Sequence, residues 1–100
     1  MRLSPAQTRL ILNCVHAQFG DDAAVRLFGS RLDDAARGGD VDLLVESAAP
    51  ATVRQRALAT LALAQALNLP VDIVVQQRGT PGSAFARSVR ARAQLLEAGP

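Results

Sequence analysis

Apolar residues recur along the first twenty positions at the spacing of an amphipathic helix. The positions that share one face are Leu10, Ile11, Cys14, Val15 and, one turn later, Phe19. Ser4 and Pro5 precede this face as an expected N-cap and first helical residue. Gly20 follows it and is expected to end the helix.

Three short apolar runs then follow the two-residue period of a strand, at residues 24–28, 40–46 and 71–75. In the second run, Val41, Leu43 and Val45 share the face expected to lie on the core. In the third run, Asp72 lies on the opposite face from Ile73. A lone Asp in such a run is costly unless it is paired or binds a metal ion.

Helical patterns separate and follow these strands. Residues 30–34 predict a short helical turn. The run at residues 51–67 predicts a long helix that ends at Asn68, before Pro70. Its expected buried stripe comprises Val53, Ala57, Leu61 and Ala64. Thr80 and Pro81 predict the start of a last helix, with Phe85, Val89 and Leu96 as its buried stripe.

The order of these elements predicts an α/β fold. We expect a small mixed β-sheet of three or more strands with helices packed against it. The whole chain, residues 1–100, is expected to form a single domain.

Composition narrows the possible functions. No apolar run reaches the roughly 20 residues that span a bilayer, and residues 1–5 lack the apolar stretch of a secretory signal. The single Cys14 excludes an internal disulfide and fits a reducing compartment, so we expect a cytoplasmic protein. All 11 basic residues are Arg, but the formal charge is only +2. With no Trp or Tyr for stacking bases, we do not expect nucleic acid as a direct ligand.

The stretch GSRLDDAARGGDVD at residues 29–42 carries the candidate chemistry. Asp40 and Asp42 place two carboxylates side by side, which is unfavourable unless a cation lies between them. Oxygen ligands of this kind suit Mg²⁺. Gly29 and Ser30, at a strand-to-helix junction, offer backbone N–H groups and a hydroxyl to a phosphate. A metal ion and a phosphate at two ends of one stretch point to phosphoryl or nucleotidyl transfer.

These residues resemble the signature of the DNA polymerase β-like nucleotidyltransferase superfamily. The matching parts are the run FGS at residues 28–30, nine intervening residues, and the run DVDLLV at residues 40–45. The short chain resembles the minimal nucleotidyltransferase (MNT) branch. One departure is Gly39, because many minimal members have Ser before the first Asp. This departure leaves the conformation of the loop open.

The resemblance implies Mg²⁺-dependent transfer of a nucleoside monophosphate, most often AMP from ATP, to a hydroxyl group. The implied catalytic and metal-binding residues are Asp40, Asp42 and Asp72, which would hold two Mg²⁺ ions. The implied nucleotide-binding residues are Gly29, Ser30, Arg31 and Arg37. Alternatives remain for some of them: Asp72 could be a strand-edge Asp that accepts from a backbone amide, and the two arginines could be solvated.

The resemblance also implies a partner. Minimal nucleotidyltransferases often pair with a small helical HEPN-type ribonuclease in toxin–antitoxin modules, so this chain is expected to be the antitoxin. It would adenylylate a hydroxyl of the toxin, or, as the alternative, neutralise the toxin as a binding module by occlusion. Phe85 and Val89 are expected to anchor the last helix, while Arg87, Arg90 and Arg92 project toward that partner.

Overall fold

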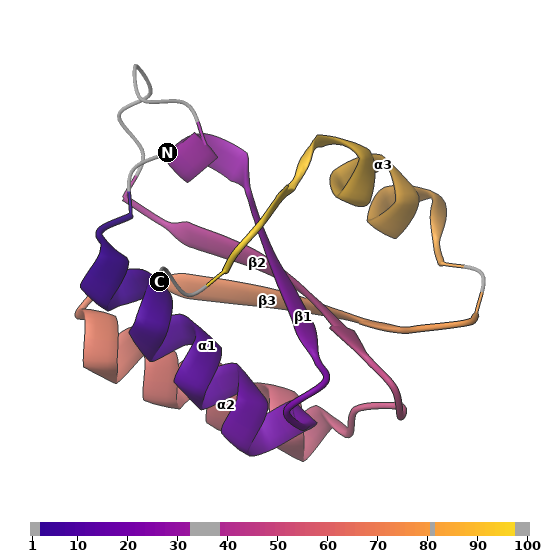
Figure 1. Ribbon diagram of the computed structural model, residues 1–100, viewed down its shortest axis with the longest axis horizontal. Helices are drawn as coiled ribbons and strands as arrows, with labels where there is room; N and C mark the ends of the chain where they lie inside the picture. The colour runs from indigo at the N-terminus through magenta and orange to yellow at the C-terminus, as the bar shows by residue number, and fades with distance from the viewer. Residues whose placement is uncertain (1–2, 33–38, 81, 98–100) are drawn as a thin grey trace.

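One four-stranded sheet organises the chain (Figure 1). The computed structural model describes residues 3–32, 39–80 and 82–97. The elements are α1 (Pro5–Phe19), β1 (Ala24–Phe28), the 3₁₀ helix η1 (Gly29–Leu32), β2 (Val41–Ser47), α2 (Val53–Leu67), β3 (Val71–Gln77), α3 (Ala84–Arg92) and β4 (Gln94–Leu95). The expected α/β class and mixed sheet are confirmed.

The strands lie in the order β3-β2-β1-β4. β1 is antiparallel to both β2 and β4, whereas β2 and β3 are parallel and are joined through α2. In this register Asp42 lies opposite Phe28 on one side and beside Asp72 on the other. β3 is an edge strand, so one side of it is open.

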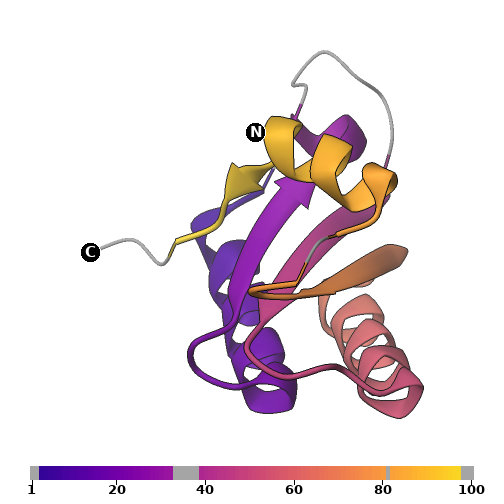
Figure 2. The same cartoon turned by 90° about the vertical axis from the view of Figure 1, so that its right-hand side faces the viewer.

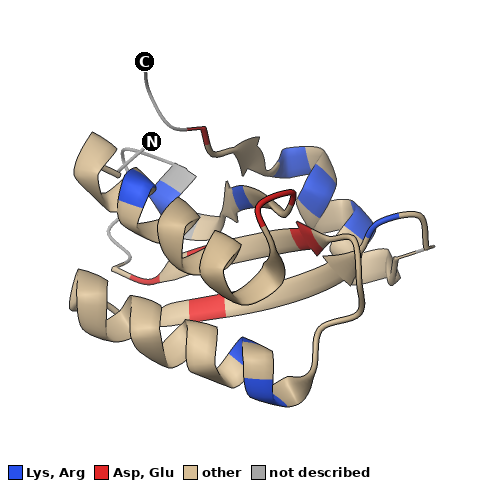
Figure 3. Ribbon diagram, turned by 60° about the horizontal axis from the view of Figure 1, so that its bottom comes forward, with Lys and Arg blue, Asp and Glu red and all other residues tan. Residues whose placement is uncertain are grey.

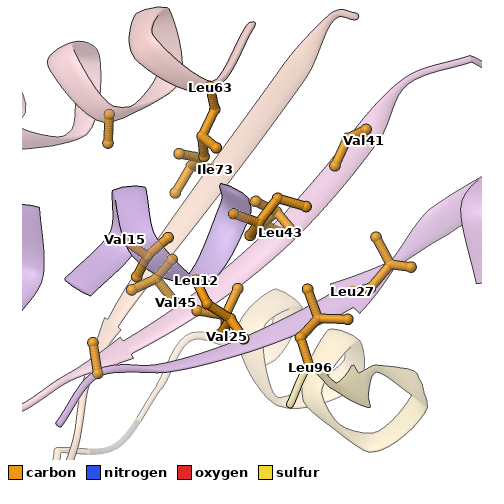
Figure 4. Close-up of a cluster of buried hydrophobic side chains, with 13 residues drawn as sticks. Leu12, Val15, Val25, Leu27, Val41, Leu43, Val45, Leu63, Ile73 and Leu96 are labelled. Carbon is orange, nitrogen blue, oxygen red and sulfur yellow. The ribbon is translucent and has the colours of Figure 1, made fainter. Parts of the chain in front are cut away.

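The two long helices α1 and α2 cover one face of the sheet (Figure 1). Val41, Leu43 and Val45 of β2 are fully buried on that face, as their alternation predicted. Figure 4 shows how the side chains of this core lie, with Leu63 of α2 close to Ile73 of β3. Because one face of β2 is apolar throughout, a one-residue slip would expose its core residues and bury its carboxylates.

The last helix α3 lies on the opposite face of the sheet from α1 and α2 (Figure 2). It contacts β1 and β2, and its buried residues are Ala86 and Val89. Leu44, which points to this face by alternation, is buried as well. The remainder of this face is therefore more open than the face under the long helices.

Caps fix the ends of the helices. Ser4 forms the expected capping box with Gln7 at the start of α1. Thr52 forms a second capping box with Gln55, so α2 begins at Val53, two residues later than the sequence suggested. Asn68 ends α2 in the left-handed conformation at a φ of 55°, as expected. Within the described residues, no helix has the length and apolar character that crossing a membrane needs.

The buried stripe predicted for α2 was wrong. Val53 is 76% exposed and Leu61 is 56% exposed, whereas Ala59 and Leu63 are completely buried. α2 carries Ala and Leu on nearly every side, so its sequence has little helical periodicity to distinguish one face from another. The choice of face is made by packing against α1 and β3, which the local pattern does not contain.

The start of the last helix was also misplaced. α3 begins at Ala84, and its N-cap is Ser83, whose hydroxyl accepts from the backbone N–H of Ala86 at 3.0 Å. The expected first residue, Pro81, lies outside the described residues. Phe85, expected to be buried, is 58% exposed. Leu96 is buried as expected, but it lies after β4 and not in the last helix. β3 extends to Gln77 because β2 continues beside it as far as Ser47.

The corrected face of α2 predicts unequal effects for two leucines of one helix. Leu63→Ala should lower the free energy of unfolding by about 2–5 kcal/mol, because it leaves a cavity in the core. Leu61→Ala should change it by roughly 0.5 kcal/mol or less, as expected for a surface site. Urea denaturation followed by circular dichroism measures both. Equal losses of unfolding free energy in the two variants would instead support the buried stripe that contains Leu61.

Candidate functional site

Two aspartates meet on the open face of the sheet. Asp42 of β2 and Asp72 of β3 are direct neighbours in the parallel register, and neighbouring strands lie about 4.8 Å apart. Figure 3 shows acidic segments (red) on these adjacent strands. Asp40 is exposed and comes just before β2, because the strand begins at Val41, one residue later than expected. The structure therefore gathers acids from two separate parts of the sequence at one end of two strands.

Burial and neighbouring negative charges both act on Asp42. Burial raises the pKa of Asp42, and the charges of Asp72 and Asp40 raise this pKa further. The folded state therefore loses stability relative to the unfolded chain as the pH rises and Asp42 ionises. A cation between the carboxylates would remove this penalty.

The donor set suits Mg²⁺, but it is not a finished metal cage. Over residues 3–32, 39–80 and 82–97, no three His, Cys, Asp or Glu side chains gather closely enough to form a metal site by themselves. Mg²⁺ commonly binds through one or two carboxylates and completes its shell with water and substrate phosphates. The adjacent Asp42 and Asp72 fit a site of that kind, and Asp40 is near enough for its charge to raise the pKa of Asp42 further, after burial and the charge of Asp72.

Gly29 brings the β1–η1 junction against Asp42. Its φ is +79°, a left-handed conformation that favours glycine. A Cβ atom at this position would collide with Oδ2 of Asp42. The sequence suggested that Gly29 leaves space for a phosphate, and the structure gives a further reason: only glycine lets the backbone of this junction approach the carboxylate so closely.

Of the other candidates for nucleotide binding, the structure describes Ser30 and Arg31 but not Arg37. Ser30 is the second residue of η1, directly beside Gly29. Nη2 of Arg31 donates to the carbonyl of Gly39 at 3.0 Å and so connects η1 to the residue before Asp40. Arg37 lies outside the described residues. The nucleotide contacts expected for these residues stay predictions.

Arg92 is a candidate that sequence reasoning missed. Together with Phe28, Gly29 and Val89 it lines a cavity of about 250 Å³ beneath α3. The only hydrogen bonds of its guanidinium among the described residues go to the carbonyl and hydroxyl of Ser88, both at 3.4 Å. The sequence analysis expected Arg92 to face a partner. It did not place Arg92 near Gly29, because local periodicity does not show that α3 crosses the end of β1. A positive charge therefore lies beside the Gly29 junction.

Arg90 also differs from the prediction. It remains largely exposed, but its Nε donates to Oε2 of Glu46 at 2.8 Å. It is thus held against the sheet through Nε, a contact that the sequence did not predict, while its role toward a partner stays a prediction.

Known proteins resemble this chain in sequence and in fold. The family model described as nucleotidyltransferase domain matches residues 9–94. A search of curated proteins finds no match. Several solved structures have a similar fold.

A structure described as tri-AMPylated HEPN toxin in complex with MNT antitoxin, from Shewanella oneidensis, contains a similar chain. It is 20% identical, with a TM-score of 0.71, over 94% of this chain and 71% of that chain. A second structure from Shewanella oneidensis is 19% identical, with a TM-score of 0.67 and the same coverage. A structure described as a minimal nucleotidyltransferase is 29% identical, with a TM-score of 0.67, over 92% of this chain and 95% of that chain.

Proposed function

Because this chain belongs to the nucleotidyltransferase domain family, we propose that it transfers AMP from ATP to a hydroxyl group on a partner protein, with Mg²⁺ as cofactor. The observation that carries the proposal is the meeting of Gly29, Asp42 and Asp72 at one end of the open face. These residues supply a backbone approach for phosphate and oxygen ligands for a metal ion. We also propose that the chain acts in the cytoplasm, because a single cysteine, Cys14, fits a reducing compartment.

Each residue of the site has a task in such a transfer. Asp40 and Asp42 would hold two Mg²⁺ ions, and Asp72 would complete the second metal site. Bound Mg²⁺ neutralises phosphate charge and lowers the pKa of an attacking hydroxyl. Gly29 and Ser30 would hold the β- and γ-phosphates through backbone N–H groups and the serine hydroxyl. Arg31 and Arg37 remain candidates for the triphosphate, and the structure adds Arg92.

The bond changes of the reaction follow from this arrangement. The hydroxyl oxygen of the acceptor forms a bond to the α-phosphorus, and the bond from that phosphorus to the pyrophosphate oxygen breaks. Asp72, exposed on the edge strand, is the group proposed to take the proton of the hydroxyl. Catalysis then depends mainly on positioning and charge neutralisation.

A groove beside Asp72 supports a protein as the carrier of the acceptor. The groove has a volume of about 550 Å³ and is lined by residues of α2 and β3, including Val53, Leu61 and Asp72. Exposed apolar residues next to a polar site are typical of a surface that binds another protein. The AMPylated toxin complex named above suggests the class of this partner, a helical HEPN-type toxin.

The same groove favours one alternative, a binding module that neutralises its partner by occlusion. An apolar surface can hold a partner without any chemistry at Asp42. The two functions separate in Asp42→Asn, which keeps the groove but loses a metal ligand. Neutralisation of the partner by this variant, without nucleotide transfer, would favour occlusion.

Binding of Mg-ATP tests the proposed function. Mg-ATP at a hundredfold excess over Kd should stabilise the wild-type chain by about 2.7 kcal/mol, which raises Tm by roughly 10–20 °C in a chain of this size. Asp42→Asn should lose most of this response because it removes a metal ligand. Differential scanning fluorimetry measures Tm. Asp21→Asn, an equal change of charge at an exposed turn, is the control. A full response in Asp42→Asn would remove the main support for the proposal.

The position of Arg92 predicts a specific loss of nucleotide affinity. Arg92→Gln should weaken Mg-ATP binding about tenfold, because a charge-assisted hydrogen bond is worth about 1.5–3 kcal/mol. Isothermal titration calorimetry gives Kd. Arg54→Gln, on the exposed side of α2, changes the net charge equally and should leave Kd unchanged. If both variants bind Mg-ATP like wild type, Arg92 does not contact the triphosphate.

A further inference from the structure

A second and larger cavity lies on the same face of the sheet as the aspartates, toward the other end of β2 and β3. It has a volume of about 590 Å³ and lies between the sheet, α3 and the segment that joins β3 to α3. Five charged residues line it: Arg26, Glu46, Arg78, Arg87 and Arg90. None of them belongs to the site described above.

A buried carboxylate holds two of these arginines in place. Oε1 of Glu46 accepts from Nε of Arg26 at 2.6 Å, and Oε2 accepts from Nε of Arg90 at 2.8 Å. Burial would raise the pKa of Glu46, but the hydrogen bonds from Arg26 and Arg90 outweigh it and lower this pKa. Glu46 is therefore ionised at neutral pH. Each guanidinium is bound through Nε, and among the described residues its Nη atoms have no hydrogen-bond partner.

The charges of this cavity do not cancel. Its lining contains four arginines and one glutamate, a net of three positive charges. Arg78 is partly neutralised by Asp22, whose Oδ2 lies 3.0 Å from Nη2. Within the part of the chain that the structure describes, Arg87 donates only to the carbonyl of Gly82, at 2.8 Å, and keeps its full charge. Guanidinium groups bind carboxylates through two parallel hydrogen bonds, so the cavity suits an acidic side chain.

The distance between the two sites suits one extended peptide. Asp72 and Gln76 lie on the same face of β3, and Gln76 lines this cavity. Four residues of a strand span about 13 Å. An extended segment of the acceptor polypeptide that runs along β3, over the half-buried Val74, could therefore reach both the aspartates and the arginines.

We propose that this arginine-lined cavity binds an acidic side chain of the acceptor polypeptide and so selects hydroxyl groups that lie in acidic segments. The inference rests on the proposed function for the identity of the acceptor. It adds a specificity site, formed by Arg26, Arg87 and Arg90 and positioned by Glu46.

A polypeptide fits the cavity better than a nucleic acid does. None of the described residues that line it is aromatic, so unpaired bases would find no stacking surface there. Four arginines gather around this cavity, whereas a nucleic-acid backbone needs a basic path along several phosphates. The exposed apolar groove beside Asp72 also favours a protein.

Binding of a short fluorescein-labelled poly-glutamate peptide, measured by fluorescence anisotropy, tests the proposal on the full chain. Wild type should bind it saturably, and Arg87→Gln/Arg90→Gln should bind it about tenfold more weakly or worse. The control Arg9→Gln/Arg54→Gln changes two exposed arginines that line neither site, and it should bind like wild type. Arg87→Gln alone leaves Glu46 with both partners and should weaken binding at an unchanged Tm.

Four results would overturn the proposal. The first is an absence of saturable peptide binding, and the second is equal affinity of the two double variants for the peptide. The third is that a single-stranded RNA oligomer binds more tightly than the peptide and that the same arginine changes abolish its binding. The fourth is loss of Mg-ATP binding in Arg87→Gln/Arg90→Gln. The last result would assign the cavity to the nucleotide.

The peptide-binding test can fail or succeed independently of the Mg-ATP test of the proposed function. Asp42→Asn should keep peptide binding. If its Tm response to Mg-ATP were also complete, the nucleotide site would fail while the arginine cavity stands.

Discussion

The parallel register of β2 and β3 is the constraint on which the rest of the site depends. It sets Asp42 beside Asp72, so that burial first and then the like charge of Asp72 raise the pKa of Asp42. The register is held by the buried alternation of Val41, Leu43 and Val45 under α1 and α2. Burial of one face thus determines which side chains the other face presents, and a slip of β2 by one residue would turn Asp42 inward.

The charges on the open face are arranged in two groups that α3 links. Arg92, at the end of α3, lines the cavity beside Gly29, while Arg87 and Arg90 line the larger cavity next to Glu46. One helix of nine residues therefore brings positive charge to both places. Its capping by Ser83 and its buried contacts through Ala86 and Val89 fix this arrangement.

Alternation along the strands made much of the fold and site predictable from sequence. The faces of β2 and β3, the candidate carboxylates and the Gly29 junction could be inferred because they depend on local patterns. The buried face of α2 could not, since alanine and leucine surround that helix and only its neighbours choose between Leu61 and Leu63. The placement of Arg92 and the pairing of Arg90 with Glu46 depend on contacts between distant segments, which periodicity does not encode.

Transfer of label from ATP to a protein tests the central claim most directly. The chain is incubated with Mg²⁺, a HEPN-type partner and ATP that carries the label on either the α- or the γ-phosphate, and the proteins are then separated. The account predicts that the α-label becomes bound to the partner, that the γ-label leaves as pyrophosphate, and that Asp42→Asn and Asp72→Asn abolish incorporation. Incorporation of the γ-label, or α-label transfer that survives both substitutions, would contradict it.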